Sequence, residues 1–203
     1  YEEAAAAFER ACAGQPNSAD YRNSYGNSLL AQTRISEAAE QYNQAISLQP
    51  DFAEAHNNLA NCLVSLEQRE DAVASYRRSL ALKPEQALVA CNLGNTLRHM
   101  GRLAESVEAF EHALRFEPDL FNIYNGMGLT LQTQNRHEEA AEKFKRGLEI
   151  NPDYPEALNN LAISEAAVGH IDEAIAAYSK LLEIDPDLAE GYFNLASLRQ
   201  SIN

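Results

Sequence analysis

The sequence lacks long apolar segments and is poor in positive charge. No apolar run approaches the roughly 18 residues that a transmembrane helix needs, and the mean hydropathy is −0.40, so we expect no membrane span. Sixteen Lys and Arg oppose 30 Asp and Glu, which gives the 203 residues a net charge of −14. Nucleic-acid binding requires a surplus of Lys and Arg on one face. The charge therefore argues against a nucleic-acid partner.

Cysteine, glycine and proline are also scarce. Cys12, Cys62 and Cys91 are far apart and form no CxxC pair, so we expect neither a zinc site nor a disulfide framework. Free thiols favour a reducing, cytoplasmic compartment. Nine Gly and seven Pro fall below the average share of about 12%, which indicates helices. The chain begins YEEAAAAFERA, with neither Met nor a leader, and we expect a segment of a longer protein.

The prolines reveal an internal repeat, because six of the seven are spaced by 34 residues: Pro16, Pro50, Pro84, Pro118, Pro152 and Pro186. A fixed period of this length predicts a solenoid. We number the places of each repeat from the third residue after its proline. The complete repeats are then 19–52, 53–86, 87–120, 121–154 and 155–188, with half repeats at 1–18 and 189–203. The whole chain is predicted to be a single array.

Other places repeat in the same register. The eighth place is always small, with Gly26, Ala60, Gly94, Gly128, Ala162 and Ala196. The twenty-fourth is always one aromatic ring, with Phe8, Tyr42, Tyr76, Phe110, Phe144 and Tyr178. Apolar spacing predicts a helix over places 1–14 and another over places 18–31, or about 12 helices in all. We expect the small residues to let two helices approach and the ring to fill the space between them.

Helix ends and one apolar place show departures from this pattern. Gly101, Asn135 and Gly169 close the first helix of three repeats with residues that tolerate a left-handed backbone. Thr33 and Glu67 occupy the same place and break the pattern. Glu165 and Arg199 stand where other repeats have Leu.

These columns resemble the tetratricopeptide repeat (TPR), as in GNSLL…EAAEQYNQAISLQP, LANCL…DAVASYRRSLALKP and LGNTL…ESVEAFEHALRFEP. The resemblance covers the whole chain. It implies an all-α, right-handed superhelical solenoid of antiparallel helix pairs, whose first helices line the concave side.

Enzyme motifs such as HExxH, GxSxG and GxxxxGK[ST] are absent from the sequence. We therefore expect no catalytic residue, no cofactor site and no metal site. The five histidines are expected at solvated positions, and Cys91 is the one thiol expected on the concave side. No Lys, Arg or His is placed in the sequence to lower the pKa of Cys91, so it is interpreted as a small filler.

Asparagine is the one residue type concentrated on a single face. The fifth, sixth and ninth places of the first helices give 18 positions, and the 17 Asn of the chain would supply one or two of these by chance. Eleven are Asn: Asn23, Asn27, Asn57, Asn58, Asn61, Asn92, Asn95, Asn125, Asn159, Asn160 and Asn194. Each costs about 0.6 kcal/mol of helix propensity relative to Ala. The repeated use of a poor helix-forming residue on one face of the first helices indicates that this face has a function.

An Asn amide carries an acceptor and two donors, so a ladder of them can bind the backbone of an extended peptide. The alternative is that these side chains hydrate a groove or bond between adjacent helices. The ladder resembles the TPR superhelix of O-linked N-acetylglucosamine transferases, where concave asparagines hold substrate peptides. It does not resemble the clamp for chaperone tails, because Arg98 is the only base predicted well inside the groove. Asp20, Glu54, Glu156 and Glu190 at its edge disfavour an acidic ligand.

Three functions follow as hypotheses. The first is a non-catalytic protein–protein interaction module that binds an extended segment of a partner. The second is a scaffold that self-associates weakly through uncapped terminal helices, with Tyr192, Leu195 and Leu198 on the apolar face of the last one. The third is the substrate-recruiting arm of a larger enzyme such as a glycosyltransferase.

Overall fold

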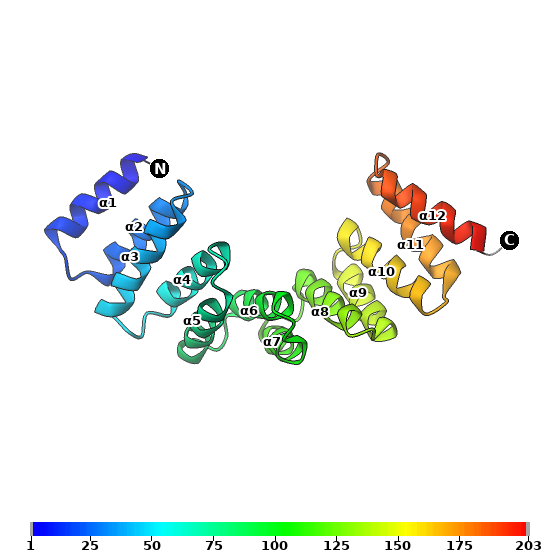
Figure 1. Ribbon diagram of the computed structural model, residues 1–203, viewed down its shortest axis with the longest axis horizontal. Helices are drawn as coiled ribbons and strands as arrows, with labels where there is room; N and C mark the ends of the chain where they lie inside the picture. The colour runs from blue at the N-terminus through cyan, green and yellow to red at the C-terminus, as the bar shows by residue number, and fades with distance from the viewer. Residues whose placement is uncertain (1, 202–203) are drawn as a thin grey trace. The chain divides into compact units, whose positions relative to one another are not determined.

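The computed structural model describes residues 2–201, apart from the side chains of residues 2, 4 and 201. Tyr1 and residues 202–203 of the terminal half repeats, and the side chain of Ala4, lie outside this description. Within residues 2–201 the regular structure is entirely helical (Figure 1). The helices are α1 (Glu2–Gly14), α2 (Ala19–Leu30), α3 (Ile35–Leu48), α4 (Ala53–Ser65), α5 (Arg69–Leu82), α6 (Ala87–His99), α7 (Leu103–Phe116), α8 (Phe121–Thr133), α9 (His137–Ile150), α10 (Pro155–Ala167), α11 (Ile171–Ile184) and α12 (Ala189–Ser201).

The helix bounds follow the 34-residue repeat and confirm the all-α fold. First helices begin at the first place of each repeat, and second helices begin one residue earlier than the sequence predicted. The second helices α3, α5, α7, α9 and α11 each end two residues before a proline of the repeat, because proline cannot continue a helix. No helix of the described part of the chain is long and apolar enough to cross a bilayer.

The chain divides into two compact units, residues 1–96 and 97–203, and each is described by itself. In the first unit, α2 packs on α3, α3 on α4, and α4 on α5. In the second, α8 packs on α9, α9 on α10, and α10 on α11 (Figure 1). Each helix thus contacts mainly its sequence neighbours, as in other repeat proteins.

The aromatic and small places of the repeat meet as expected. The rings of Tyr42 and Phe144 are fully buried. A Cβ atom added to Gly26 would lie 2.6 Å from Tyr42 Cε1, and one added to Gly128 would lie 2.5 Å from Phe144 Cε1. The missing Cβ atoms therefore allow the ring of the second helix to press against the first helix.

A residue with a left-handed backbone follows the first helix of every complete repeat, always at the same place. Gly101 and Gly169 have φ values of 74° and 85°. Thr33, Glu67 and Asn135 have φ values of 59°, 62° and 59°. The N–H that follows each of them bonds the carbonyl five residues back, as from Arg34 to Leu29 at 3.0 Å, which is a Schellman closure. Thr33 and Glu67 therefore adopt the same left-handed backbone as Gly101, Asn135 and Gly169, although they are not residue types that favour it.

The fourth place of the first helix corrects the expectation for one histidine. His56 is buried, and its Nε2 lies 3.1 Å from the carbonyl oxygen of Pro50. Tyr124 holds the same place in a later repeat, and its hydroxyl donates to the carbonyl of Pro118 at 3.0 Å. The prediction of a solvated position was wrong for His56, because the end of the preceding repeat offers a carbonyl to a donor at this place.

Glu165 occupies a buried leucine place and is paired with two neighbours. Its side chain is 1% exposed, Lys145 Nζ lies 2.6 Å from Oε1, and His170 Nδ1 lies 2.8 Å from Oε2. Burial raises the pKa of Glu165, but the hydrogen bonds from Lys145 and His170 outweigh this effect and leave the pKa below its usual value. The carboxylate therefore stays ionised inside the second unit.

Replacing Thr33 with Gly should stabilise the first unit. A left-handed backbone costs a β-branched residue about 1–2 kcal/mol, and the greater entropy of an unfolded glycine offsets part of this gain. We expect a net gain of about 0.5–1 kcal/mol, seen as a higher urea midpoint by circular dichroism. Ser36→Gly, within α3, is the control and should lower the midpoint. A lower midpoint for Thr33→Gly would contradict the argument.

Replacing the partner of Glu165 should cost more than replacing Glu165 itself. Lys145→Met weakens the pairing of a buried carboxylate and should lower stability by about 1–2 kcal/mol. Glu165→Leu restores the apolar residue of other repeats and should cost less than about 1 kcal/mol. Lys180→Met removes only the exposed pair with Asp153 and should change stability by less than about 0.5 kcal/mol.

The same variants should differ in their response to acid. The folded-state pKa of Glu165 is lowered, so its stabilising effect is present above the unfolded pKa and is lost as the pH falls through the folded value. Wild type should therefore lose stability relative to Glu165→Leu when urea midpoints are compared at pH 7 and pH 3. A constant difference between the two proteins would contradict the ion-pair assignment.

Candidate functional site

Within each unit, the asparagines of the fifth, sixth and ninth places lie on one side of the first helices, and we call this surface of the unit its asparagine face. In the first unit it carries Asn23, Asn27, Asn57, Asn58, Asn61, Asn92 and Asn95 on α2, α4 and α6. In the second unit it carries Asn125, Asn159, Asn160 and Asn194 on α8, α10 and α12. Only Asn23 is buried, and the others are exposed or half-buried.

Sixth-place amides connect neighbouring repeats in the first unit. Asn58 Nδ2 donates to Asn23 Oδ1 at 3.1 Å and to Asn27 Oδ1 at 3.2 Å. Asn92 Nδ2 donates to Asn61 Oδ1 at 3.4 Å. Part of the ladder therefore bonds between adjacent helices, which was the alternative interpretation of its sequence.

Two buried tyrosines orient the ninth-place amides. The hydroxyl of Tyr42 donates to Asn27 Oδ1 at 2.7 Å, and that of Tyr76 donates to Asn61 Oδ1 at 2.6 Å. Burial raises the pKa of both tyrosines well above its usual value, so they remain donors. Sequence reasoning missed this link, although Tyr at the twenty-fourth place coincides with Asn at the ninth in both repeats.

These bonds leave a defined set of free donors. Asn27 Oδ1 and Asn61 Oδ1 each accept two hydrogen bonds, whereas neither Nδ2 has a partner among the described residues. Asn23 is 4% exposed, donates to Glu54 Oε1 at 2.9 Å and accepts from Asn58, so both ends of its amide are used within the array. Asn57 Nδ2 reaches Asn58 Oδ1 at 3.4 Å. Asn95 Nδ2 lies 3.8 Å from Cys91 Sγ on its own helix.

The second unit has a shorter network. Asn160 Nδ2 donates to Asn125 Oδ1 at 3.0 Å, and Asn125 Nδ2 donates to the hydroxyl of Tyr154 at 3.3 Å. Asn194, on α12, is half-buried. Asn159 is half-buried, and its amide makes no hydrogen bond within the described part of the chain.

Arg98 and Cys91 behave differently from the asparagines. Arg98 is half-buried, its Nε is buried without a hydrogen-bond partner among the described residues, and burial lowers its pKa. Cys91 is 4% exposed, and burial raises its pKa to about 11. The thiol therefore stays protonated near neutral pH, and its role as a filler fits its position. Among the described residues, no three His, Cys, Asp or Glu side chains gather as metal ligands would.

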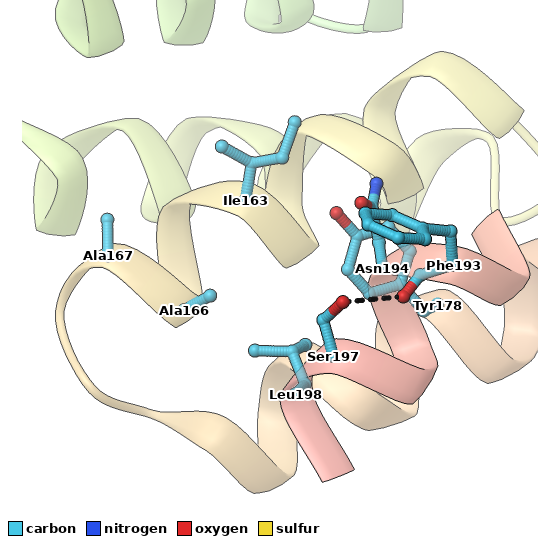
Figure 2. Close-up of a pocket in the computed structure, with 8 residues that line it drawn as sticks. All are labelled: Ile163, Ala166, Ala167, Tyr178, Phe193, Asn194, Ser197 and Leu198. Carbon is cyan, nitrogen blue, oxygen red and sulfur yellow. Dashed lines mark hydrogen bonds between the residues drawn. The ribbon is translucent and has the colours of Figure 1, made fainter. Parts of the chain in front are cut away.

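The asparagine face ends in an apolar pocket between α10 and α12. Ile163 takes a ninth place and Phe193 a fifth place, and their exposed fractions are 42% and 72%. The pocket has a volume of about 500 Å³ and is lined by Ile163, Ala166, Ala167, Tyr178, Phe193, Asn194, Ser197 and Leu198 (Figure 2). The sequence prediction considered the asparagines alone and did not include Ile163 and Phe193, which replace them at these two places.

The last helix departs from its predicted exposure. Leu195 is only 8% exposed, so the expectation that it belongs to an uncovered apolar face was wrong. Leu195 packs inward because α11 covers this side of α12. Tyr192 is 52% exposed and Leu198 is half-buried.

Comparison with known protein families agrees with the repeat. Tetratricopeptide repeat profiles match residues 26–66, 53–86, 85–153 and 131–198, which together span most of the chain. The chain belongs to the TPR family. TPR arrays are interaction modules, so the family indicates a protein partner at this general level. No curated protein sequence matches the chain.

Solved TPR structures share the fold at low sequence identity. YrrB, described as a TPR protein with an unusual peptide-binding site, is 20% identical with a TM-score of 0.79, over 94% of this chain and 98% of its own. PilF of Pseudomonas aeruginosa is 20% identical with a TM-score of 0.78, over 93% and 86%. MamA of Desulfovibrio magneticus RS-1 is 15% identical with a TM-score of 0.78, over 84% and 97%. At these identities the similarity concerns the fold.

Proposed function

We propose that the asparagine face of this TPR protein binds an extended segment of a partner protein through the peptide backbone. The observation that carries the proposal is the state of Asn27 and Asn61. Each has its Oδ1 held by a tyrosine hydroxyl and by the amide of the next repeat, and its Nδ2 is left without a partner among the described residues. A backbone carbonyl of a bound peptide can accept from each Nδ2.

Because the Oδ1 atoms of Asn27 and Asn61 are held by hydrogen bonds, their Nδ2 donors are already oriented before a ligand binds. A side chain that is already held loses little rotamer freedom on binding, which lowers the cost of association. Contacts to backbone carbonyls do not select side chains, so partners of different sequence can bind. In the second unit Asn159 has a similarly available amide.

The asparagines therefore divide into two groups with different roles. Asn58, Asn92 and Asn160 donate their amide protons to the neighbouring repeat, and we assign them mainly to stiffening the array. Asn27, Asn61 and Asn159 are assigned to the ligand. The YrrB description supports peptide binding as a function of this fold. A role as the recruiting arm of a larger enzyme remains a second hypothesis that rests on the resemblance of the ladder.

Aspartate substitutions separate the two roles of the ninth-place amides. Asn27→Asp with Asn61→Asp keeps an oxygen for each tyrosine hydroxyl but removes the free Nδ2 donor. Each lost hydrogen bond is worth about 0.5–1.5 kcal/mol, so the double variant should bind at least about tenfold more weakly. The ligand is a synthetic peptide selected on wild type from a random displayed library and capped at both ends, and affinity is measured by calorimetry.

The matched control carries the same two negative charges outside the asparagine face. Asn17→Asp with Asn43→Asp changes exposed residues before α2 and on α3 and should leave affinity within about twofold. Both double variants should keep the melting temperature of wild type. Equal affinity of the two double variants for the peptide would overturn the assignment.

The bridging group is tested by stability. Asn58→Ala removes two inter-repeat bonds, which are worth about 0.5–1.5 kcal/mol each, and gains about 0.6 kcal/mol of helix propensity. We expect a net loss of up to about 1–2 kcal/mol, seen as a lower urea midpoint, with a smaller change in affinity than in the Asn27/Asn61 variant. A raised midpoint would show that these bonds contribute nothing to the array.

A further inference from the structure

The pocket between α10 and α12 is built where the asparagine columns stop. The ninth place is Asn in the repeats that begin at residues 19, 53 and 87, and it becomes Leu129 and then Ile163. The fifth place is Asn in four repeats and becomes Phe193. The same face of the second unit therefore changes from amide to apolar chemistry within one turn of Asn159 and Asn160.

Few polar atoms line this pocket, and one of them already has a partner. Ser197 Oγ donates to the carbonyl oxygen of Phe193 on its own helix at 2.9 Å (Figure 2). The side chains of Tyr178 and Asn194 contribute the other polar atoms of the lining. The remaining lining is contributed by Ile163, Ala166, Ala167, Phe193 and Leu198. A ligand group that enters therefore meets mainly carbon surface, so burial of an apolar group favours binding at this site.

The surroundings of the pocket are acidic. Residues 155–203, which supply all of its lining, contain two Lys and Arg against eight Asp and Glu. Glu190 lies one turn before Phe193 and Asn194 on α12 and is close enough to act on the Tyr178 hydroxyl. Positive charge beside the entering group is therefore favoured. A second copy of the chain, with its net charge of −14, would bring like charge to the same surface.

We propose that this pocket anchors one large apolar side chain, of the size of Leu, Met or Phe, from an extended partner segment whose neighbouring residues are Lys or Arg. The inference rests on the proposed function, because the asparagine face holds the backbone of that segment. Amide contacts to a peptide backbone do not select side chains, whereas the pocket selects one. A volume of about 500 Å³ is within the range of pockets that bind small molecules and has room for one such side chain.

Host peptides of sequence AKAXAKA, capped at both ends, test the specificity. Partial burial of a large side chain contributes about 1.4 kcal/mol, which is tenfold in affinity. Peptides with Leu or Phe at X should thus bind about tenfold more tightly than the peptide with Ala, by fluorescence anisotropy of labelled peptides. Replacing both Lys with Glu should abolish most of the binding at low salt.

Variants that restore the amide of other repeats locate the effect. Ile163→Asn and Phe193→Asn introduce the residue that other repeats carry at those places, both of which are exposed, so the fold should be kept. Each should bring the Leu-to-Ala affinity ratio close to one while leaving the Ala peptide within about twofold. Ile184→Asn is the matched control, because Ile184 is 37% exposed at the end of α11 and does not line the pocket. It should keep the wild-type ratio.

A second measurement does not depend on the asparagine face. N-acetyl-leucinamide should shift the δ1-methyl resonance of Ile163 in a methyl-labelled sample, and N-acetyl-alaninamide should shift it far less. Binding of the Leu peptide with no binding of the Ala peptide, together with the methyl shift, would support the pocket and overturn the backbone proposal for the second unit. An equal affinity for both peptides would overturn the pocket alone.

Two further results would also overturn the pocket proposal. One is a methyl response that is the same for the two amides. The other is concentration-dependent dimerisation in sedimentation that Phe193→Asn abolishes, because the pocket would then be occupied by a second copy of the chain.

Discussion

The contact between the aromatic ring of a second helix and the small residue of its first helix is the constraint on which the rest depends. Tyr42 against Gly26 and Phe144 against Gly128 set how closely a second helix approaches its first helix. Because interiors are packed to the density of organic crystals, this distance fixes the orientation of the pair. Within each unit, successive first helices then present their fifth, sixth and ninth places on the same side. A face built from those places exists only because the core contact is repeated.

The same ring also connects the core to the surface. Where it is tyrosine, in Tyr42 and Tyr76, the hydroxyl bonds a ninth-place asparagine. Phe144 has no hydroxyl, and the ninth place of its repeat is Leu129. Tyr178 belongs to a repeat whose ninth place is Ile163, which offers no amide to its hydroxyl. The ring hydroxyl and the ninth-place amide do not always occur together, because Phe110 shares its repeat with Asn95. Among the described residues, the bond from the ring to the face therefore occurs in the repeats that begin at residues 19 and 53.

The sequence was sufficient for the period, the helix pairs, the ring contact and the asparagine face, because each depends on residues within one repeat. It was insufficient for contacts that join repeats. Asn58 bonds residues 31 and 35 positions earlier in the chain. The pattern within one repeat does not predict which atoms of an amide take part in such a bond. The left-handed Thr33 and the ion pairs of Glu165 were overlooked because each residue departs from the usual type while the surrounding structure keeps the usual geometry.

Asparagine can serve both stability and binding because its amide has two separate ends. In Asn27 and Asn61 the oxygen belongs to the array and the nitrogen is available, so a bound peptide need not break an internal bond to form its own. A helix that carries many asparagines loses propensity, and the bonds between repeats offset part of that loss. Serine or aspartate could accept the tyrosine hydroxyl but would offer no such second pair of donors. The residue type that is unfavourable for a helix is thus the one that can join the array and a peptide at the same position.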